Sequence, residues 1–151
     1  MKRFLTAAGF LAGMFLATTA WADDYIRGKS AHNFQDTAKR LEQAIEVRNI
    51  RLIAKVNHAG AARESGLSLR PTTVYIFGNP QLGTPLMKEN QESAIDLPMK
   101  ILLWQNALGE VWLSYRDPAS MASQWGIDPG HASISRMTRG LKAILADALL
   151  D

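Results

Sequence analysis

The chain has 151 residues and no cysteine, and its 17 basic and 14 acidic side chains give a formal charge of +3. The absence of cysteine excludes a disulfide framework, a thiolate zinc site, an iron–sulfur cluster and a cysteine nucleophile. Because 47% of the residues are apolar, the composition also argues against a largely disordered chain.

Residues 1–22 show the three-part pattern of a secretory signal peptide. Two basic residues precede an apolar stretch over 4–19, and the small residues Ala20 and Ala22 form a cleavage site. The apolar stretch is shorter than the roughly 20 residues that a permanent membrane span needs. We therefore predict cleavage after Ala22, a periplasmic or secreted location, and no stable membrane span after cleavage.

The charge of the mature chain argues against a nucleic-acid partner. Removing Lys2 and Arg3 with the signal peptide lowers the basic count from 17 to 15, against 14 acidic residues. A net charge of +1 lacks the electrostatic footprint of a nucleic-acid binder. Residues 23–151 contain no repeat, low-complexity tract or linker-like composition, so we predict a single domain over 23–151.

The first predicted elements of the mature chain are a strand over 25–32 and a helix that follows it. Asn33 is a predicted N-cap with Asp36 three residues later, and Asn49 can end the helix in the left-handed conformation. Alternating apolar residues then predict a strand over 50–57, with Ile53 as the exception to the alternation. The apolar stripe of the helix consists of Phe34, Ala38, Leu41 and Ile45.

A connection rich in glycine and alanine leads to the next predicted strand, over 72–77. This segment is β-branched and aromatic, and the Gly-Asn-Pro sequence that follows should end it. Thr84 followed by Pro85 predicts the beginning of a short helix that runs toward Ser93.

The last third of the chain predicts a hairpin followed by two helices. Residues 100–104 are apolar on both faces, as in a central strand, and a turn at 106–109 joins them to a strand over 111–116. Asp117 caps a short helix that ends before Gly126. The final helix has an inner stripe of Ile134, Met137, Leu141, Ile144, Leu145 and Ala148.

The predicted order is strand, helix, four strands with short helices inserted, and helix. Strands that follow one another without a long helix between them favour antiparallel pairing. Two long amphipathic helices can cover only one face of such a sheet. We therefore predict an α+β fold of two layers, an antiparallel sheet with its helices on one face.

Three stretches of the chain resemble a known bacterial family. The sequences over 71–87 and 94–118, preceded by Asn57-His58-Ala59, resemble domain of unknown function 302, and the resemblance extends from about residue 33 to the last helix. It implies a TATA-binding-protein-like architecture and a homodimer, and it implies no known activity. Asn57 stands where the resemblance leads us to expect an aspartate, and Arg116 where it leads us to expect a small polar residue.

His58 and Asp96 are the candidate polar site residues. His58 ends a predicted strand beside small residues, which suits a proton carrier or metal ligand, and Asp96 is the best carboxylate partner. Together they would form a base with its orienter or two metal ligands. Alternatively, His58 bonds a loop and Asp96 caps a turn. No close histidine pair accompanies them, so we predict no separate metal site, and the sequence specifies no cofactor.

The glycine-rich loop over 78–85 is a weaker candidate for an anion site. Backbone N–H groups near Gly78, Gly83 and Thr84 could hold an anion at a helix start. However, the loop's two prolines remove donors and no lysine stands at the phosphate-loop position. We therefore favour a tight turn between strand and helix.

Three aromatic residues form the candidate contact surface. Tyr75, Phe77 and Trp112 alternate with aliphatic residues, and we predict that they lie on the face of the sheet that the helices leave open. Such a patch suits a second copy of the chain or an apolar ligand, and we favour the homodimer. A copper site is not indicated, because Met87, Met99, Met121 and Met137 are scattered along the sequence.

The sequence thus favours an exported, dimeric, non-catalytic module that binds a small molecule or an envelope protein. The three aromatic residues would form its contact surface, and His58 and Asp96 would be its polar points. The alternative is a small hydrolase, an isomerase or a metal-handling protein centred on His58 and Asp96.

Overall fold

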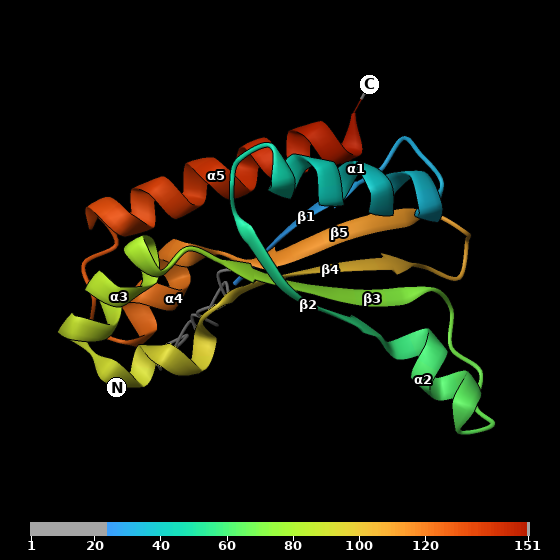
Figure 1. Cartoon of the computed structure of the whole chain (residues 1–151), viewed down its shortest axis with the longest axis horizontal. Helices are drawn as coiled ribbons and strands as arrows, with labels where there is room; N and C mark the ends of the chain where they lie inside the picture. The colour runs from blue at the N-terminus through green and yellow to red at the C-terminus, as the bar shows by residue number, and fades with distance from the viewer. Residues whose placement is uncertain (1–23, 151) are drawn as a thin grey trace, which may run out of the picture.

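The computed structural model describes residues 24–150, so the predicted signal peptide over 1–22 lies outside the described residues. The strands are β1 (Tyr25–Lys29), β2 (Arg51–Asn57), β3 (Thr72–Gly78), β4 (Met99–Gln105) and β5 (Val111–Arg116). The helices are α1 (Phe34–Glu46), α2 (His58–Glu64), α3 (Pro80–Glu89), the 3-10 helix η1 (Gln91–Asp96), α4 (Pro118–Gln124) and α5 (Ala132–Leu149) (Figure 1). None of the helices found over 24–150 has the length and apolar character of a membrane span.

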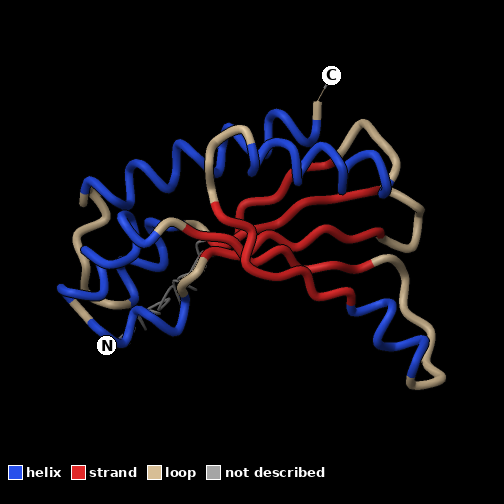
Figure 2. The backbone as a smooth tube through the Cα atoms, in the orientation of Figure 1, coloured by secondary structure: helices blue, strands red, loops and turns tan. Residues whose placement is uncertain are grey.

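The five strands form one antiparallel sheet in the order β1-β5-β4-β3-β2. The helices α1 and α5 pack against each other on one face of this sheet (Figures 1 and 2). The predicted α+β class with two layers is therefore confirmed. β4 lies in the middle of the sheet, as the apolar sequence of 100–104 indicated.

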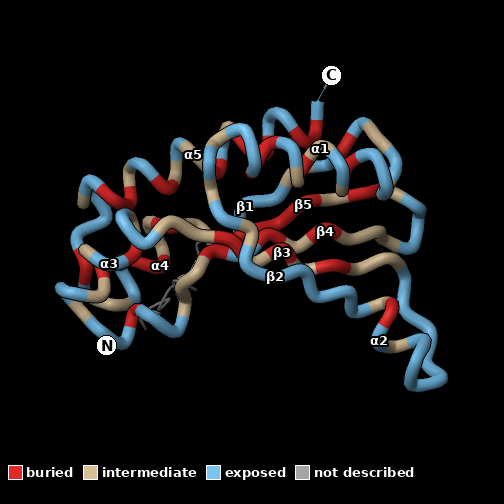
Figure 3. The backbone as a smooth tube through the Cα atoms, in the orientation of Figure 1, coloured by how far each residue is buried: buried red, intermediate tan, exposed pale blue. Residues whose placement is uncertain are grey.

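The core lies between the sheet and the two long helices. Buried positions alternate along β3 and β4, predominate along β5, and recur on the inner stripes of α1 and α5 (Figure 3). Burial of this layer supplies the main stabilising contribution to the domain. The fully buried aliphatic side chains include Leu41, Leu86, Ile101, Leu103, Leu113 and Ile144.

The short-range signals for helix ends and turns correspond closely to the structure. The side chain of Asn33 accepts a hydrogen bond from the Asp36 N–H at 2.9 Å, and Asn49 has a φ of 52°. Gly109 has a φ of 80° in the β4–β5 turn, which a residue with a Cβ adopts only at a cost. Asp117 caps α4.

Several element boundaries differ from the sequence predictions. The first strand ends at Lys29, and the connection after β2 is the helix α2, whose Gly60 N–H bonds the Asn57 side chain at 2.8 Å. Alanine-rich segments form helices readily, but α2 lacks the apolar stripe that would have revealed it. Helix α3 begins at Pro80 rather than Thr84, because the Asn79 side chain caps it.

A shift in register interrupts the pairing of β2 with β3 between Leu52 and Ala54. Ile53 lies in this irregularity, which is a β-bulge in an edge strand. The bulge is the physical reason that Ile53 breaks the alternation of apolar and polar residues seen in the sequence.

The predicted orientation of Tyr75 and Phe77 is wrong, because both are buried beneath the helices. Directly paired residues share a face, and Tyr75 pairs with Ile101, which pairs with Tyr115. Since β3 is apolar on both faces, its alternation alone cannot select the inner one. Trp112 lies on the opposite face, which α1 and α5 leave open.

Two neighbouring leucines on β4 test this division of the sheet. Leu103 is fully buried under the helices, whereas Leu102 is half-buried on the open face. We expect Leu103→Ala to lower the free energy of unfolding by about 2–5 kcal/mol, and Leu102→Ala by about 1 kcal/mol. Urea denaturation of dilute protein measures both values, and equal losses would contradict the layering.

Candidate functional site

An apolar cavity of about 520 Å³ lies at the end of the sheet where β2 begins and β3 ends. Helices α3 and α5 form two of its walls, and the segment from η1 to β4 forms a third. Its volume is within the range of small-molecule sites in proteins. The apolar side chains that line it include Ile50, Ile53, Phe77, Leu82, Met87, Leu97, Met99, Met137, Leu141 and Ile144.

Glycines shape the walls of this cavity. A Cβ added to Gly78 would lie 3.1 Å from the Pro98 Cβ, so glycine at the end of β3 allows the turn before β4 to approach closely. A Cβ added to Gly140, on α5, would meet no heavy atom within 4 Å. The missing side chain at Gly140 therefore leaves open space on the wall that α5 contributes.

Three methionines converge on the cavity from separate elements. Met87 comes from α3, Met99 from β4 and Met137 from α5. Their scattered positions in the sequence gave no signal of this, because the convergence depends on long-range packing. Methionine side chains are flexible and polarizable, so a lining of this kind adapts to ligands of different shapes.

Two arginines line the same cavity and are exposed to solvent. Arg51 begins β2, and Arg136 lies in the first half of α5. None of the residues that line the cavity is acidic, and within residues 24–150 neither arginine forms an ion pair. The cavity therefore combines an apolar interior with positive charge at its solvent-exposed side.

The loop over 78–85, the weaker candidate for an anion site, does not have the geometry of one. Gly83 and Thr84 lie inside α3 rather than in a loop. The N–H of Gln81 bonds the Asn79 side chain at 2.9 Å, and the N–H groups of Leu82 and Gly83 bond the Asn79 carbonyl. These donors are thus used within the turn. Gly78, Gly83 and Thr84 all line the apolar cavity instead.

The open face of the sheet has an apolar centre. Its tryptophans Trp104 and Trp112 are cross-strand partners whose ring centroids lie 6.3 Å apart, with 22° between the ring planes. Trp104 Nε1 donates to Ser114 Oγ at 3.1 Å. We define the open face as the residues Val56, Val74, Ile76, Leu102, Trp104 and Trp112.

Tyr75 lies at the inner edge of the core rather than on this surface. Its hydroxyl donates to Glu42 Oε1 at 3.5 Å, and Lys55 bonds the same oxygen at 2.7 Å. The Lys55 ammonium also lies 5.5 Å from the centre of the Tyr75 ring. Burial, and next the Glu42 carboxylate, raise the pKa of Tyr75 to about 12.

Asp96 is engaged by partners within the described chain. Its Oδ2 atom accepts from Trp125 Nε1 at 2.6 Å and pairs with the Arg116 guanidinium at 2.7 Å. Arg116 also contacts the Gln124 side chain. These contacts join η1, β5 and the end of α4, so Arg116 has a structural partner in Asp96.

His58 and Asp96 do not come together. Because β3 pairs antiparallel with both β2 and β4, β2 ends where β3 begins and β4 begins where β3 ends. His58 follows the last residue of β2, whereas Asp96 comes three residues before β4 begins. The two residues thus lie at opposite ends of the sheet. A base with its orienter, or a shared metal site, cannot be built from this pair.

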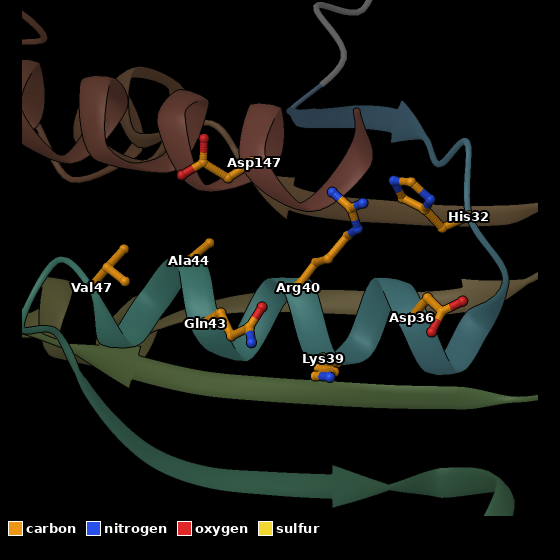
Figure 4. Close-up of a pocket in the computed structure, with 8 residues that line it drawn as sticks. All are labelled: His32, Asp36, Lys39, Arg40, Gln43, Ala44, Val47 and Asp147. Carbon is orange, nitrogen blue, oxygen red and sulfur yellow. The ribbon is translucent and has the colours of Figure 1, made fainter. Parts of the chain in front are cut away.

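A second, polar groove of about 460 Å³ runs along α1 beside the end of α5. Figure 4 shows Arg40 reaching from α1 toward α5, where it donates to the Leu150 carbonyl at 3.0 Å. The groove carries charges of both signs from Asp36, Lys39 and Asp147. Over residues 24–150, no group of three or more histidine, aspartate and glutamate side chains could hold a metal ion.

The family model described as "Domain of unknown function DUF302" matches residues 26–148. The fold is similar to the "Crystal structure of uncharacterized conserved protein DUF302 from Bacillus stearothermophilus", with a TM-score of 0.74 and 20% sequence identity. This similarity covers 85% of the present chain and 99% of the other chain.

Curated relatives match a shorter part of the chain. "Fluoride-specific ion channel FluC 1" of Brucella suis biovar 1 (strain 1330) is 38% identical over 96 residues, which are 64% of this chain and 38% of that protein. The protein of the same name from Brucella abortus biovar 1 (strain 9-941) is also 38% identical over 96 residues, covering 36% of its length. The present chain therefore matches well under half the length of these relatives.

Alkaline titration tests the environment of Tyr75. Its pKa is about 12 in the folded protein against an ordinary value of 10.0, so the folded state keeps a proton that the unfolded state loses between these values. The resulting stabilisation is fully present below pH 10 and falls as the pH rises toward 12. We expect the free energy of unfolding to fall less steeply in Tyr75→Phe over this range, as measured by urea denaturation. An unchanged slope would contradict the assignment.

Proposed function

The chain belongs to the DUF302 family, and within that family we propose that it is an exported, non-catalytic domain whose apolar cavity binds a small molecule. This proposal rests on the cavity of about 520 Å³ that lies between α3, α5 and the end of the sheet where β2 begins and β3 ends. Most of its lining side chains are apolar, so burial of a ligand's apolar surface in the cavity would favour binding.

A binding role is favoured over catalysis by the placement of the polar residues. The reaction alternative depended on His58 and Asp96 acting together, and they lie at opposite ends of the sheet. Asp96 is already held by Arg116 and Trp125. The apolar cavity lacks an acidic side chain that could act as a general base, so it suits retention of a molecule rather than its conversion.

Export is the part of the proposal that rests on the N-terminal sequence. Residues 1–22 have the pattern of a cleaved signal peptide, with cleavage after Ala22. The mature chain would then reach the periplasm or the outside of the cell and meet its ligand there.

We propose that the open face is the contact surface of a homodimer. Its centre is apolar and includes the stacked Trp104 and Trp112, a composition typical of protein interfaces. Helix α2 extends beyond the sheet, and Leu67 and Leu69 after it are 66% and 49% exposed (Figures 1 and 3). A two-fold pairing would allow the projecting segment of each copy to cover the open face of the other.

An envelope protein is the second candidate for the open face. In the Brucella proteins named as fluoride-specific ion channels, the segment similar to this chain belongs to a longer polypeptide. If that segment contacts the rest of its own polypeptide through the open face, the present chain would use the same face to bind a separate envelope protein. The oligomeric state of the chain separates the two candidates, because a stable homodimer occupies the face.

Substitutions of Gly140 test the ligand cavity. Gly140→Phe should fill the open space on the wall that α5 contributes and abolish binding of a neutral apolar fluorophore such as N-phenylnaphthylamine. Gly140→Ala should retain binding and raise the free energy of unfolding by about 1 kcal/mol, because alanine is the better helix former. Fluorescence titration and urea denaturation measure the two effects.

The matched control is Lys142→Phe, which adds the same ring at an exposed position of α5 outside the cavity lining. It should leave fluorophore binding unchanged. The cavity proposal would be wrong if the fluorophore fails to bind the unsubstituted protein, or if Gly140→Phe binds it as tightly as Lys142→Phe does.

Trp112→Ala tests the dimer surface. We expect the unsubstituted protein to sediment at twice the chain mass, and Trp112→Ala to raise the dimer dissociation constant on the order of 30-fold through loss of an interface anchor. Leu108→Ala, at a turn residue that is 83% exposed, should have no effect. A monomeric unsubstituted protein, or an unchanged dimer of a folded Trp112→Ala variant, would exclude the homodimer through this face.

A further inference from the structure

We propose that the ligand of the apolar cavity is an amphipathic anion, an apolar chain that ends in a carboxylate or phosphate group held by Arg51 and Arg136. This inference rests on the proposed binding function and adds the chemical class of the ligand. Both arginines line the cavity, and both are exposed to solvent.

The first observation is the arrangement of polarity within the cavity. Phe77, Leu141 and Ile144 line it and are at most 3% exposed, so they form its interior. Arg51 and Arg136 line the same space and are exposed, so they stand at its solvent side. A ligand that matches both regions has an apolar body and a polar head that remains near water.

The second observation is the sign of the charge. No lining residue is acidic, and among residues 24–150 neither arginine has an ion-pair partner. By contrast, Arg48 and Arg116 are paired with Asp147 and Asp96. Two unpaired guanidinium groups at one cavity favour an anion and disfavour a cation of the same shape.

The third observation is that the two arginines come from separate elements. Arg51 begins β2, and Arg136 lies on α5. Guanidinium groups bind planar or tetrahedral oxyanions through paired N–H donors, which a single lysine ammonium cannot match. In the proposed complex, an oxyanion with several oxygens accepts from both arginines, and its chain extends toward Met99 and Met137, which line the same cavity.

Competition against bound N-phenylnaphthylamine tests this inference with the purified full chain. The competitors are decanoate, decyl phosphate, decan-1-ol and decyltrimethylammonium, each below its aggregation concentration. We expect the better of the two anions to displace the fluorophore at a concentration about tenfold lower than decan-1-ol requires. The reason is that charge-assisted hydrogen bonds to the arginines would strengthen its binding by about this factor. Stronger displacement by decanoate identifies a carboxylate ligand, and stronger displacement by decyl phosphate identifies a phosphate ligand.

The variants Arg51→Gln, Arg136→Gln and the double substitution locate the effect. In the double variant, the preference for the anion over decan-1-ol should fall to about twofold or less, while the affinity for decan-1-ol is retained. Arg139→Gln, an exposed position of α5 outside the cavity lining, is the matched control and should keep the preference. Added salt should weaken the anion preference of the unsubstituted protein.

The outcomes separate this inference from the proposed function. Equal displacement by all four competitors, strongest displacement by decyltrimethylammonium, or equal effects of Arg139→Gln and the double variant would overturn the anionic class while leaving an apolar binding cavity. If N-phenylnaphthylamine does not bind at all, the proposed function fails and the inference fails with it.

Discussion

The pairing register across β3, β4 and β5 is the constraint on which the rest of the structure depends. It aligns Tyr75, Ile101 and Tyr115 on one face, and α1 and α5 bury that face. A shift of one residue in β3 would exchange its inner and outer side chains, so the register decides both the core and the surface. Val74 and Ile76 reach the open face for this reason, and the tryptophans of β4 and β5 join them.

The cavity arises where this layered packing ends. The sheet stops at Gly78, the turn at Pro98 closes against it, and α5 passes over with no side chain at Gly140. Small residues at these points leave space between elements that are otherwise well packed. The cavity therefore depends on the absence of side chains at Gly78 and Gly140, and a large residue at either position would reduce its volume.

The local features of the fold could be predicted from the sequence, whereas the site could not. The helix stripes and the caps at Asn33 and Asp117 depend on residues a few positions apart, so they are visible in the chain. The inner face of β3 depends on its partner strands, and the placement of Arg51 and Arg136 around one cavity depends on packing across the whole domain. His58 and Asp96 each lie beside a strand end in the sequence, but only the pairing of the strands decides which end of the sheet each one occupies.

The bulge at Ile53 changes what the edge strand β2 offers to other extended chains. β2 is an edge strand, and a regular edge offers unpaired backbone groups to any other extended chain. The bulge disturbs the spacing of those groups and increases the local twist. Growth of the sheet by strand addition, and with it the route to fibrils, is thereby hindered along β2.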